Sequence, residues 1–127
     1  MHRYALFLLL GCSACGAGTP APPETPAATL ERIRALVGAA ACSESTQCRT
    51  LALGVKACGG PDAYLAWSAA ATQEPALRAL AARYRAEREA ENARAQEASD
   101  CRLVVDPGAQ CRLGVCVLGA PGAARAD

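Results

Sequence analysis

The apolar positions between residues 29 and 118 change their period along the chain, and this change predicts the elements. One stripe recurs at helical spacing and consists of Leu30, Ile33, Leu36, Val37 and Ala40. It predicts a helix that Thr29 caps, because a threonine hydroxyl at the N-cap accepts an early backbone N–H. We expect this helix to end near Ala41 or Cys42.

Alternation with period two begins at Arg49 and predicts a half-buried strand. The apolar face of this strand carries Leu51, Leu53, Val55 and Ala57. Arg49 and Lys56 are expected to point outward. The sequence Cys58-Gly59-Gly60-Pro61 then ends the strand, because glycine and proline favour a turn.

The clearest helical segment begins at Thr72 or Gln73 and runs to about Ala98. Pro75 falls in its first turn, where a missing N–H costs nothing. The face expected to be buried consists of Leu77, Leu80, Ala81 and Tyr84. Beyond Tyr84 the matching positions are mostly charged, so the second half of this helix is expected to project into solvent.

A hairpin is predicted to follow. Residues 103–105 form its first arm, Asp106-Pro107-Gly108 its turn and residues 111–118 its second arm, in which Gly114 marks a bulge. Together these elements predict an α+β domain over residues 29–118, with two main helices packed on a short antiparallel sheet.

The start of the chain is a separate unit. The run Leu8-Leu9-Leu10-Gly11-Cys12 lies close behind His2 and Arg3. The apolar stretch from Tyr4 to Leu10 is far shorter than the ~20 residues of a membrane-spanning helix. It suits the apolar region of a secretory signal. Apolar residues, a small residue and then cysteine match the bacterial lipobox, in which the thiol receives a diacylglycerol. We therefore expect a signal peptide over residues 1–11 and lipidation at Cys12.

Cys15 is the alternative lipidation site. Its use would leave an even number of cysteines downstream, but Cys15 has Cys12 three residues before it, where Cys12 has Leu9. An ordinary secretory cleavage before Cys15 is the soluble alternative and fits the apolar spacing less well. Ser13 directly after Cys12 favours sorting to the outer membrane, by resemblance to sorted lipoproteins of double-membraned bacteria.

Two segments flank the domain. Residues 12–28 are rich in proline and small residues, which predicts an extended tether that spans ~3.1 Å per residue. Residues 119–127 are small and polar and are expected to form a flexible tail. Because Cys12 is expected to carry acyl groups, the expected partner of the mature chain is the lipid bilayer.

Charge and composition exclude several functions. The chain has 13 Lys and Arg, of which Arg3 leaves with the signal, and 12 Asp and Glu, so the mature charge is balanced and predicts no nucleic-acid partner. Its single histidine, His2, leaves as well, which excludes Ser-His-Asp and Cys-His catalysis. Asp62, Asp100 and Asp106 fall at expected caps and turns. We expect no enzymatic activity and no cofactor.

The domain holds six cysteines: Cys42, Cys48, Cys58, Cys101, Cys111 and Cys116. Disulfides are favoured over zinc, because no pair has CxxC spacing and no histidine remains, so no metal is expected. Of fifteen possible pairings, Cys48 with Cys58 is excluded by ~33 Å of extended strand. Cys111 with Cys116 is disfavoured within one regular arm. Cys58 with Cys101 is the leading pair, since it joins the two ends of the long helical segment.

A resemblance covers about residues 42–117. The chain is similar to a group of small, uncharacterised bacterial lipoproteins. The shared residues are Cys58-Gly59-Gly60-Pro61, Tyr64-Leu65, Ser68, Ser99-Asp100-Cys101, and Cys111 with Cys116. The resemblance implies membership of that group, and it implies no activity because none is assigned to the group.

These features predict a non-enzymatic envelope module that binds a protein or a cell-wall component. The alternative is an inhibitor of a protease or lysozyme, for which Lys56, Arg102 and Arg112 are candidate contact residues. The expected contact surface is the loop around Tyr64 and Trp67, because aromatic residues often anchor interfaces. The same two aromatics are also candidates for the core.

Overall fold

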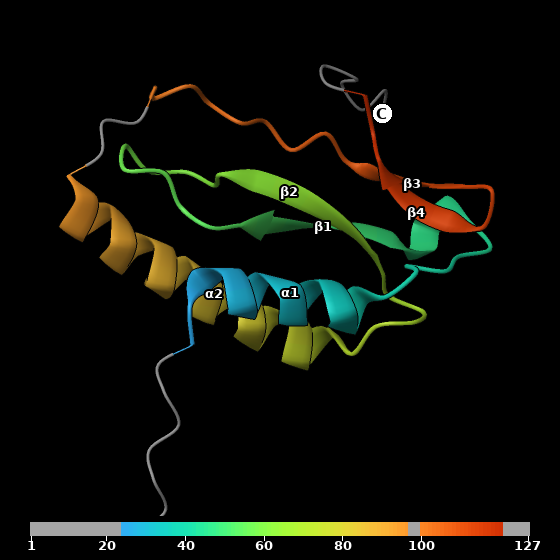
Figure 1. The fold of residues 1–127 in the computed structure, drawn as a ribbon. Coiled ribbons are helices and arrows are strands. Elements are labelled where there is room, and N and C mark those ends of the chain that lie inside the picture. Colours follow the sequence, from blue (N-terminus) through green and yellow to red (C-terminus); the bar gives the residue numbers. More distant parts are fainter. Residues whose placement is uncertain (1–23, 97–99, 121–127) are drawn as a thin grey trace, which may run out of the picture.

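The structure is a computed structural model that describes residues 24–96 and 100–120. The described elements are α1 (Pro26–Val37), η1 (a 3-10 turn, Ser45–Gln47), β1 (Cys48–Leu53), β2 (Ala63–Ser68), α2 (Glu74–Ala95), β3 (Ala109–Arg112) and β4 (Val115–Leu118). They form three layers (Figure 1): the two helices, the antiparallel β1–β2 ribbon, and the segment 101–108 with the β3–β4 hairpin. This arrangement confirms the predicted α+β class.

Helix α1 begins and ends earlier than the apolar stripe predicts. Thr25 caps it, with its Oγ1 accepting from the N–H of Ala28 at 3.2 Å, and Pro26 occupies the first helical position. The predicted cap, Thr29, is instead buried inside the helix. Gly38 ends the helix because it adopts φ +55°, a conformation that glycine reaches at little cost.

Strand β1 has the predicted buried face but ends at Leu53, earlier than the alternation predicts. Leu51, Leu53 and Val55 are buried as expected, whereas Ala57 lies beyond the strand and is exposed. Lys56, expected to point outward, has a side chain that is only 15% exposed.

Residues 63–68, where the sequence predicts a loop around Tyr64 and Trp67, instead form β2 and pair antiparallel with β1, with Leu51 opposite Leu65. The strand forms because pairing satisfies the backbone of both segments and because its aromatic residues pack well on a pleated surface.

The predicted hairpin is wrong in register. Residues 103–105 form no strand, and β3 pairs with β4 across a turn at Leu113 and Gly114. Both turn residues have positive φ, +51° and +79°, as a two-residue hairpin loop of this twist requires. Gly114 is therefore a turn residue and not a bulge.

Helix α2 confirms the expected start and buried face. Pro75 lies in its first turn, and Leu77 is fully buried. Its second half does not project freely, because Arg88 reaches Asp62 at 3.5 Å and the Asn92 side-chain N–H donates to the Val55 carbonyl at 2.7 Å. Polar contacts thus attach this half to the loop between β1 and β2.

The core lies between the helices and the β1–β2 ribbon. Its buried apolar residues are Ile33, Val37, Ala40, Cys48, Leu51, Leu53, Ala66, Trp67, Leu77 and Cys116. Trp67 has only 2% of its surface exposed, so the single tryptophan of the chain serves packing. A core of this size is small, which makes covalent links important.

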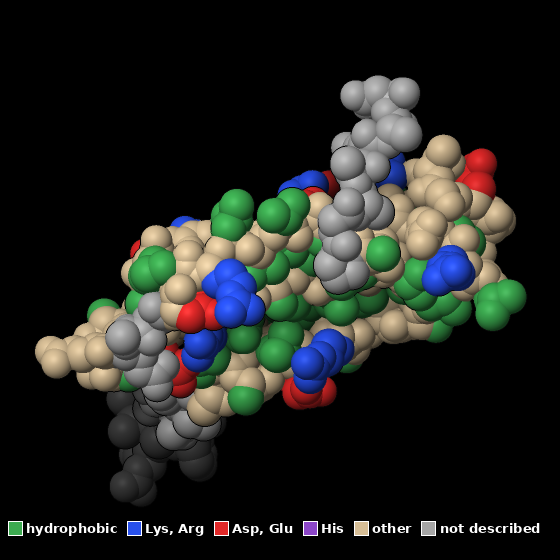
Figure 2. Space-filling view, turned by 90° about the horizontal axis from the view of Figure 1, so that it is seen from above, with side chains coloured by type: hydrophobic (Ala, Val, Ile, Leu, Met, Phe, Trp, Pro, Cys, Tyr) green, Lys and Arg blue, Asp and Glu red, His purple; other side chains and the backbone are tan. Residues whose placement is uncertain are grey.

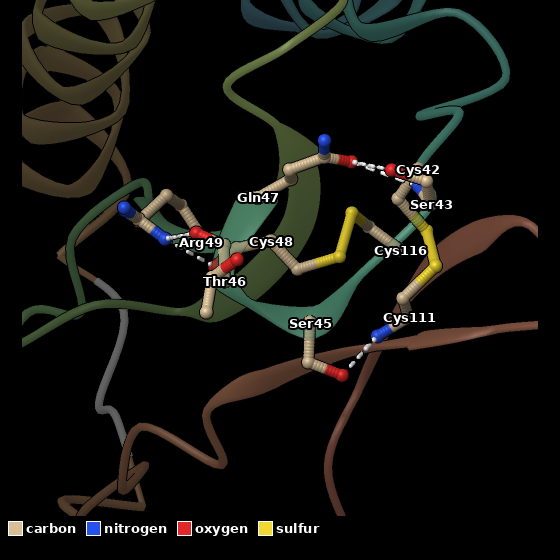
Figure 3. Close-up of a disulfide and its surroundings, with 9 residues drawn as sticks. All are labelled: Cys42, Ser43, Ser45, Thr46, Gln47, Cys48, Arg49, Cys111 and Cys116. Carbon is tan, nitrogen blue, oxygen red and sulfur yellow. Dashed lines mark hydrogen bonds between the residues drawn. A yellow bond between two sulfur atoms is a disulfide. The ribbon is translucent and has the colours of Figure 1, made fainter.

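Within the described residues, all six domain cysteines form disulfides: Cys42–Cys111, Cys48–Cys116 and Cys58–Cys101. The pairing confirms Cys58–Cys101 and assigns the two pairs that the sequence leaves open. Two of the bonds lie side by side and join the β3–β4 hairpin to the chain around β1 (Figure 3). Ser45 Oγ accepts from the Cys111 N–H there at 3.0 Å.

Replacing the buried tryptophan tests this core. Trp67→Ala is expected to lower the free energy of unfolding by about 3–5 kcal/mol, because it removes a large buried side chain and leaves a cavity. Denaturant unfolding without a reductant measures the change. Leu113→Ala, at a fully exposed side chain outside the groove, is the matched control and should stay within about 0.5 kcal/mol of the original protein. An equal loss for both variants contradicts the assignment.

Candidate functional site

The principal candidate site is an apolar groove between β2 and the segment 101–108. Its volume is about 550 Å³, within the range of ligand and side-chain pockets. The groove is lined by Asp62, Ala63, Tyr64, Leu103, Val104, Val105, Asp106, Pro107, Leu118 and Gly119. Most of these side chains are apolar, so the groove favours an apolar or amphipathic occupant.

The segment beside the groove is unusually apolar for an exposed part of the chain. Leu103 is 78% exposed and Val105 69% exposed, whereas Val104 between them is half-buried. This alternation is the pattern of an extended strand. The hairpin adds Leu113 and Leu118 as further exposed apolar residues. Figure 2 looks down on this face and shows hydrophobic side chains gathered along it. An exposed apolar patch of this kind makes this face the candidate contact surface.

The two aromatic residues expected to make contact have separate places. Tyr64 is half-buried and lines the groove. Trp67 lies in the core and offers no surface to a partner. Sequence reasoning missed residues 103–105 as site residues, because it placed them in a paired hairpin arm. Their signal in the sequence was a β-branched, apolar run next to a cysteine.

The N-terminal end of segment 101–108 is held in place by a disulfide and by ionic contacts. Cys101 is bonded to Cys58. The Lys56 ammonium, whose side chain is 15% exposed, donates to Asp100 at 3.1 Å and to the Arg102 carbonyl at 2.7 Å. Hydrogen bonds from the Arg102 N–H and from Lys56 lower the pKa of Asp100 below its ordinary value.

The second end is fixed by hydrogen bonds. Asp106 accepts from the Thr50 hydroxyl at 2.7 Å and from the Gly108 N–H at 2.8 Å. The Gly119 N–H donates to the Gly108 carbonyl at 2.9 Å. A Cβ at Gly119 would meet the Pro107 carbonyl at 2.2 Å, so only glycine fits there. The groove therefore has a wall held at both of its ends.

Three basic residues are the candidate contact residues of a hydrolase inhibitor: Lys56, Arg102 and Arg112. Lys56 is bound to Asp100 and to the Arg102 carbonyl, and little of its side chain is exposed. Arg102 is 84% exposed beside the Cys58–Cys101 bond, with Asp100 3.9 Å away. Arg112 is exposed on β3. Arg102 and Arg112 are both exposed and both directly follow a disulfide-bonded cysteine, whereas Lys56 is not exposed.

Three sulfurs lie close enough to suggest a metal site. The Sγ atoms of Cys42, Cys48 and Cys111 are within 4.8 Å of one another. Zinc binds thiolates, and each of these sulfurs is in a disulfide. In this oxidised form the cluster is therefore covalent structure rather than a ligand set.

The predicted lipidation site, Cys12, lies outside the described residues. Among the residues that are described, no helix has both the length and the apolar character needed to cross a bilayer. No protein-family model, no curated protein and no solved structure matches this chain.

The ion pair between Lys56 and Asp100 predicts how the pKa of Asp100 responds to substitution. The stabilising contribution of Asp100 is complete above its ordinary pKa and is lost as the pH falls through its lowered pKa in the folded protein. Lys56→Met should raise the pKa of Asp100 part of the way back, because the Arg102 N–H still donates to the carboxylate. An NMR titration of the Asp100 carboxyl measures this shift. Arg94→Met is the control, and an unchanged pKa in Lys56→Met contradicts the ion pair.

Proposed function

We propose that this chain is a bacterial envelope lipoprotein, anchored through Cys12, whose domain binds a partner and catalyses no reaction. The anchor would hold the domain at the outer membrane, facing the periplasm or the cell surface. The tether before α1 would let the domain stand away from the bilayer. Binding would take place in the apolar groove beside residues 101–108.

The anchoring part rests on the lipobox. Leu9, Leu10 and Gly11 precede Cys12 with the spacing of that motif. The three disulfides of the described residues support export, because such bonds persist in oxidising compartments. Two or more acyl chains hold a protein stably, whereas one chain anchors it only marginally.

The binding part rests on the groove. Leu103 and Val105 remain largely exposed although the domain has few apolar residues to spare for its core. An exposed apolar side chain costs solubility, so its retention on a clasped segment favours a role in contact. The groove wall is also fixed in advance, which reduces the entropy lost on binding.

The non-enzymatic part rests on the state of the acids and cysteines. Asp62 pairs with Arg88, Asp100 with Lys56, and Asp106 accepts from Thr50. The six domain cysteines are disulfide-bonded, so they offer no thiolate nucleophile. These acids and cysteines therefore have structural partners, which supports a binding role over a catalytic one.

The second candidate is inhibition of a protease or lysozyme. The observation in its favour is Arg102, exposed on an extended segment directly after a disulfide-bonded cysteine. A rigid, exposed cation of this kind fits the acidic pocket of a hydrolase. The identity of the captured partner separates the two candidates.

Lipidation is tested by metabolic labelling with a palmitate analogue. The original protein should be labelled, and Cys12→Ser should lose the label because the acceptor thiol is gone. Cys15→Ser is the matched control and should keep the label. If Cys15→Ser alone loses the label, the residue is wrong, and if neither variant loses it, the protein is not a lipoprotein of this kind.

The groove is tested by a photo-reactive residue placed at position 103 of the full chain in cells. Irradiation should give a covalent adduct, because Leu103 lines the groove. The same residue at Ala93, exposed on α2, is the control and should give none. Mass spectrometry of the adduct identifies the partner: a hydrolase favours inhibition, and equal adducts from both positions contradict the site.

A further inference from the structure

The residues along the groove wall have a symmetric charge pattern. Arg102-Leu103-Val104-Val105-Asp106 places a cation and an anion at equal distances from the central valine. If two such segments run antiparallel with Val104 opposite Val104, each Arg102 faces the Asp106 of the other copy. Each Leu103 then faces a Val105. The sequence is therefore complementary to itself.

The backbone of this segment is available for pairing. Among the described residues, the N–H and C=O groups of Leu103, Val104 and Val105 take part in no hydrogen bond. The segment runs alongside the β1–β2 ribbon between α2 and β3 (Figure 1). An exposed, extended and apolar run with free backbone groups behaves as an edge strand, which readily pairs with another chain.

We infer that the partner in the groove is a second copy of this chain, paired antiparallel through residues 102–106. This inference rests on the proposed function only in taking the groove as the contact surface, and it does not depend on the lipid anchor. The paired strands would form one short ladder between the two copies. The contact is isologous, as two-fold dimers require.

The charges favour this partner over an unrelated strand. Arg102 is 84% exposed, and among the described residues its one ion-pair partner is Asp100 at the long distance of 3.9 Å, so its guanidinium can reach across to a second copy. Asp106 already accepts two hydrogen bonds, and a carboxylate has about four acceptor positions. Opposite charges facing each other across paired strands stabilise the pair, whereas like charges oppose it.

The groove supplies the apolar part of the interface. Its lining includes Tyr64 and Leu118 besides the segment itself, and a second strand beside residues 102–106 would cover these side chains. Leu103 and Val105 would pack against the same residues of the second copy. Burial of this surface would stabilise the dimer through the hydrophobic effect.

Charge reversal tests the pairing. The full chain, exported and purified in a mild detergent, should show a reversible monomer–dimer equilibrium by sedimentation. Arg102→Asp should raise the dimer Kd about tenfold, since it places like charges opposite each other at two positions. Arg112→Asp makes the same charge change at an exposed site on β3 and should leave the Kd unchanged. A chain that is monomeric at every concentration overturns the inference, as does an equal effect of both variants.

A disulfide trap tests the register. In a Cys15→Ser background, Val104→Cys should form an interchain disulfide, because directly opposite residues have Cα atoms ~4.5–5.5 Å apart. Leu113→Cys is the control, since its side chain is fully exposed at the hairpin turn. If chance collision were the cause, Leu113→Cys would form at least as much dimer, and that result overturns the register. If the photo-reactive residue at position 103 crosslinks only to a different protein and never to a second copy, the dimer inference is wrong and the proposed function still holds.

Discussion

Two neighbouring disulfides hold the outer layer of this domain to its core. Cys42–Cys111 and Cys48–Cys116 each close a long loop, with sequence separations of 69 and 68 residues. Each such bond stabilises the fold by about 4 kcal/mol in the loop-entropy description. The β3–β4 hairpin buries Cys116 but leaves Leu113 and Val115 exposed, so its apolar burial is small. Without these links a two-stranded hairpin has little stability of its own.

The third disulfide, Cys58–Cys101, holds the segment that lines the groove rather than the hairpin. Cys58–Cys101, together with the Lys56 contacts, fixes the start of a segment that has no strand partner among the described residues. Thr50 and Gly119 fix its end. A free extended segment would lose much conformational entropy on binding, and these clasps remove most of that loss in advance. The same links that stabilise the domain therefore also fix the segment that lines the groove.

Local patterns in the sequence predicted that both helices exist, and they placed the start and buried face of α2 correctly. The Pro75 start and the Leu77 face of α2 follow from rules that act within a few residues. The Cys58–Cys101 pair was also accessible, because it joins the ends of one long helical segment. The sequence patterns did not predict β2 or the position of the hairpin turn. The turn was misplaced because Asp106-Pro107-Gly108 consists of strong turn residues, whereas the actual turn lies at Leu113 and Gly114. Strand pairing depends on a partner distant in sequence, which a local pattern does not identify.

The sequence alone determined the chemical limits of this protein. The lipobox-like spacing before Cys12, the absence of histidine beyond His2 and the cysteine content do not depend on the fold. The tertiary structure decided which aromatic residue is accessible: it buries Trp67 and places Tyr64 in the groove. It also decided that residues 103–105 stay unpaired. The physical reason is that exposure is set by what packs on a segment, and those neighbours come from distant parts of the chain.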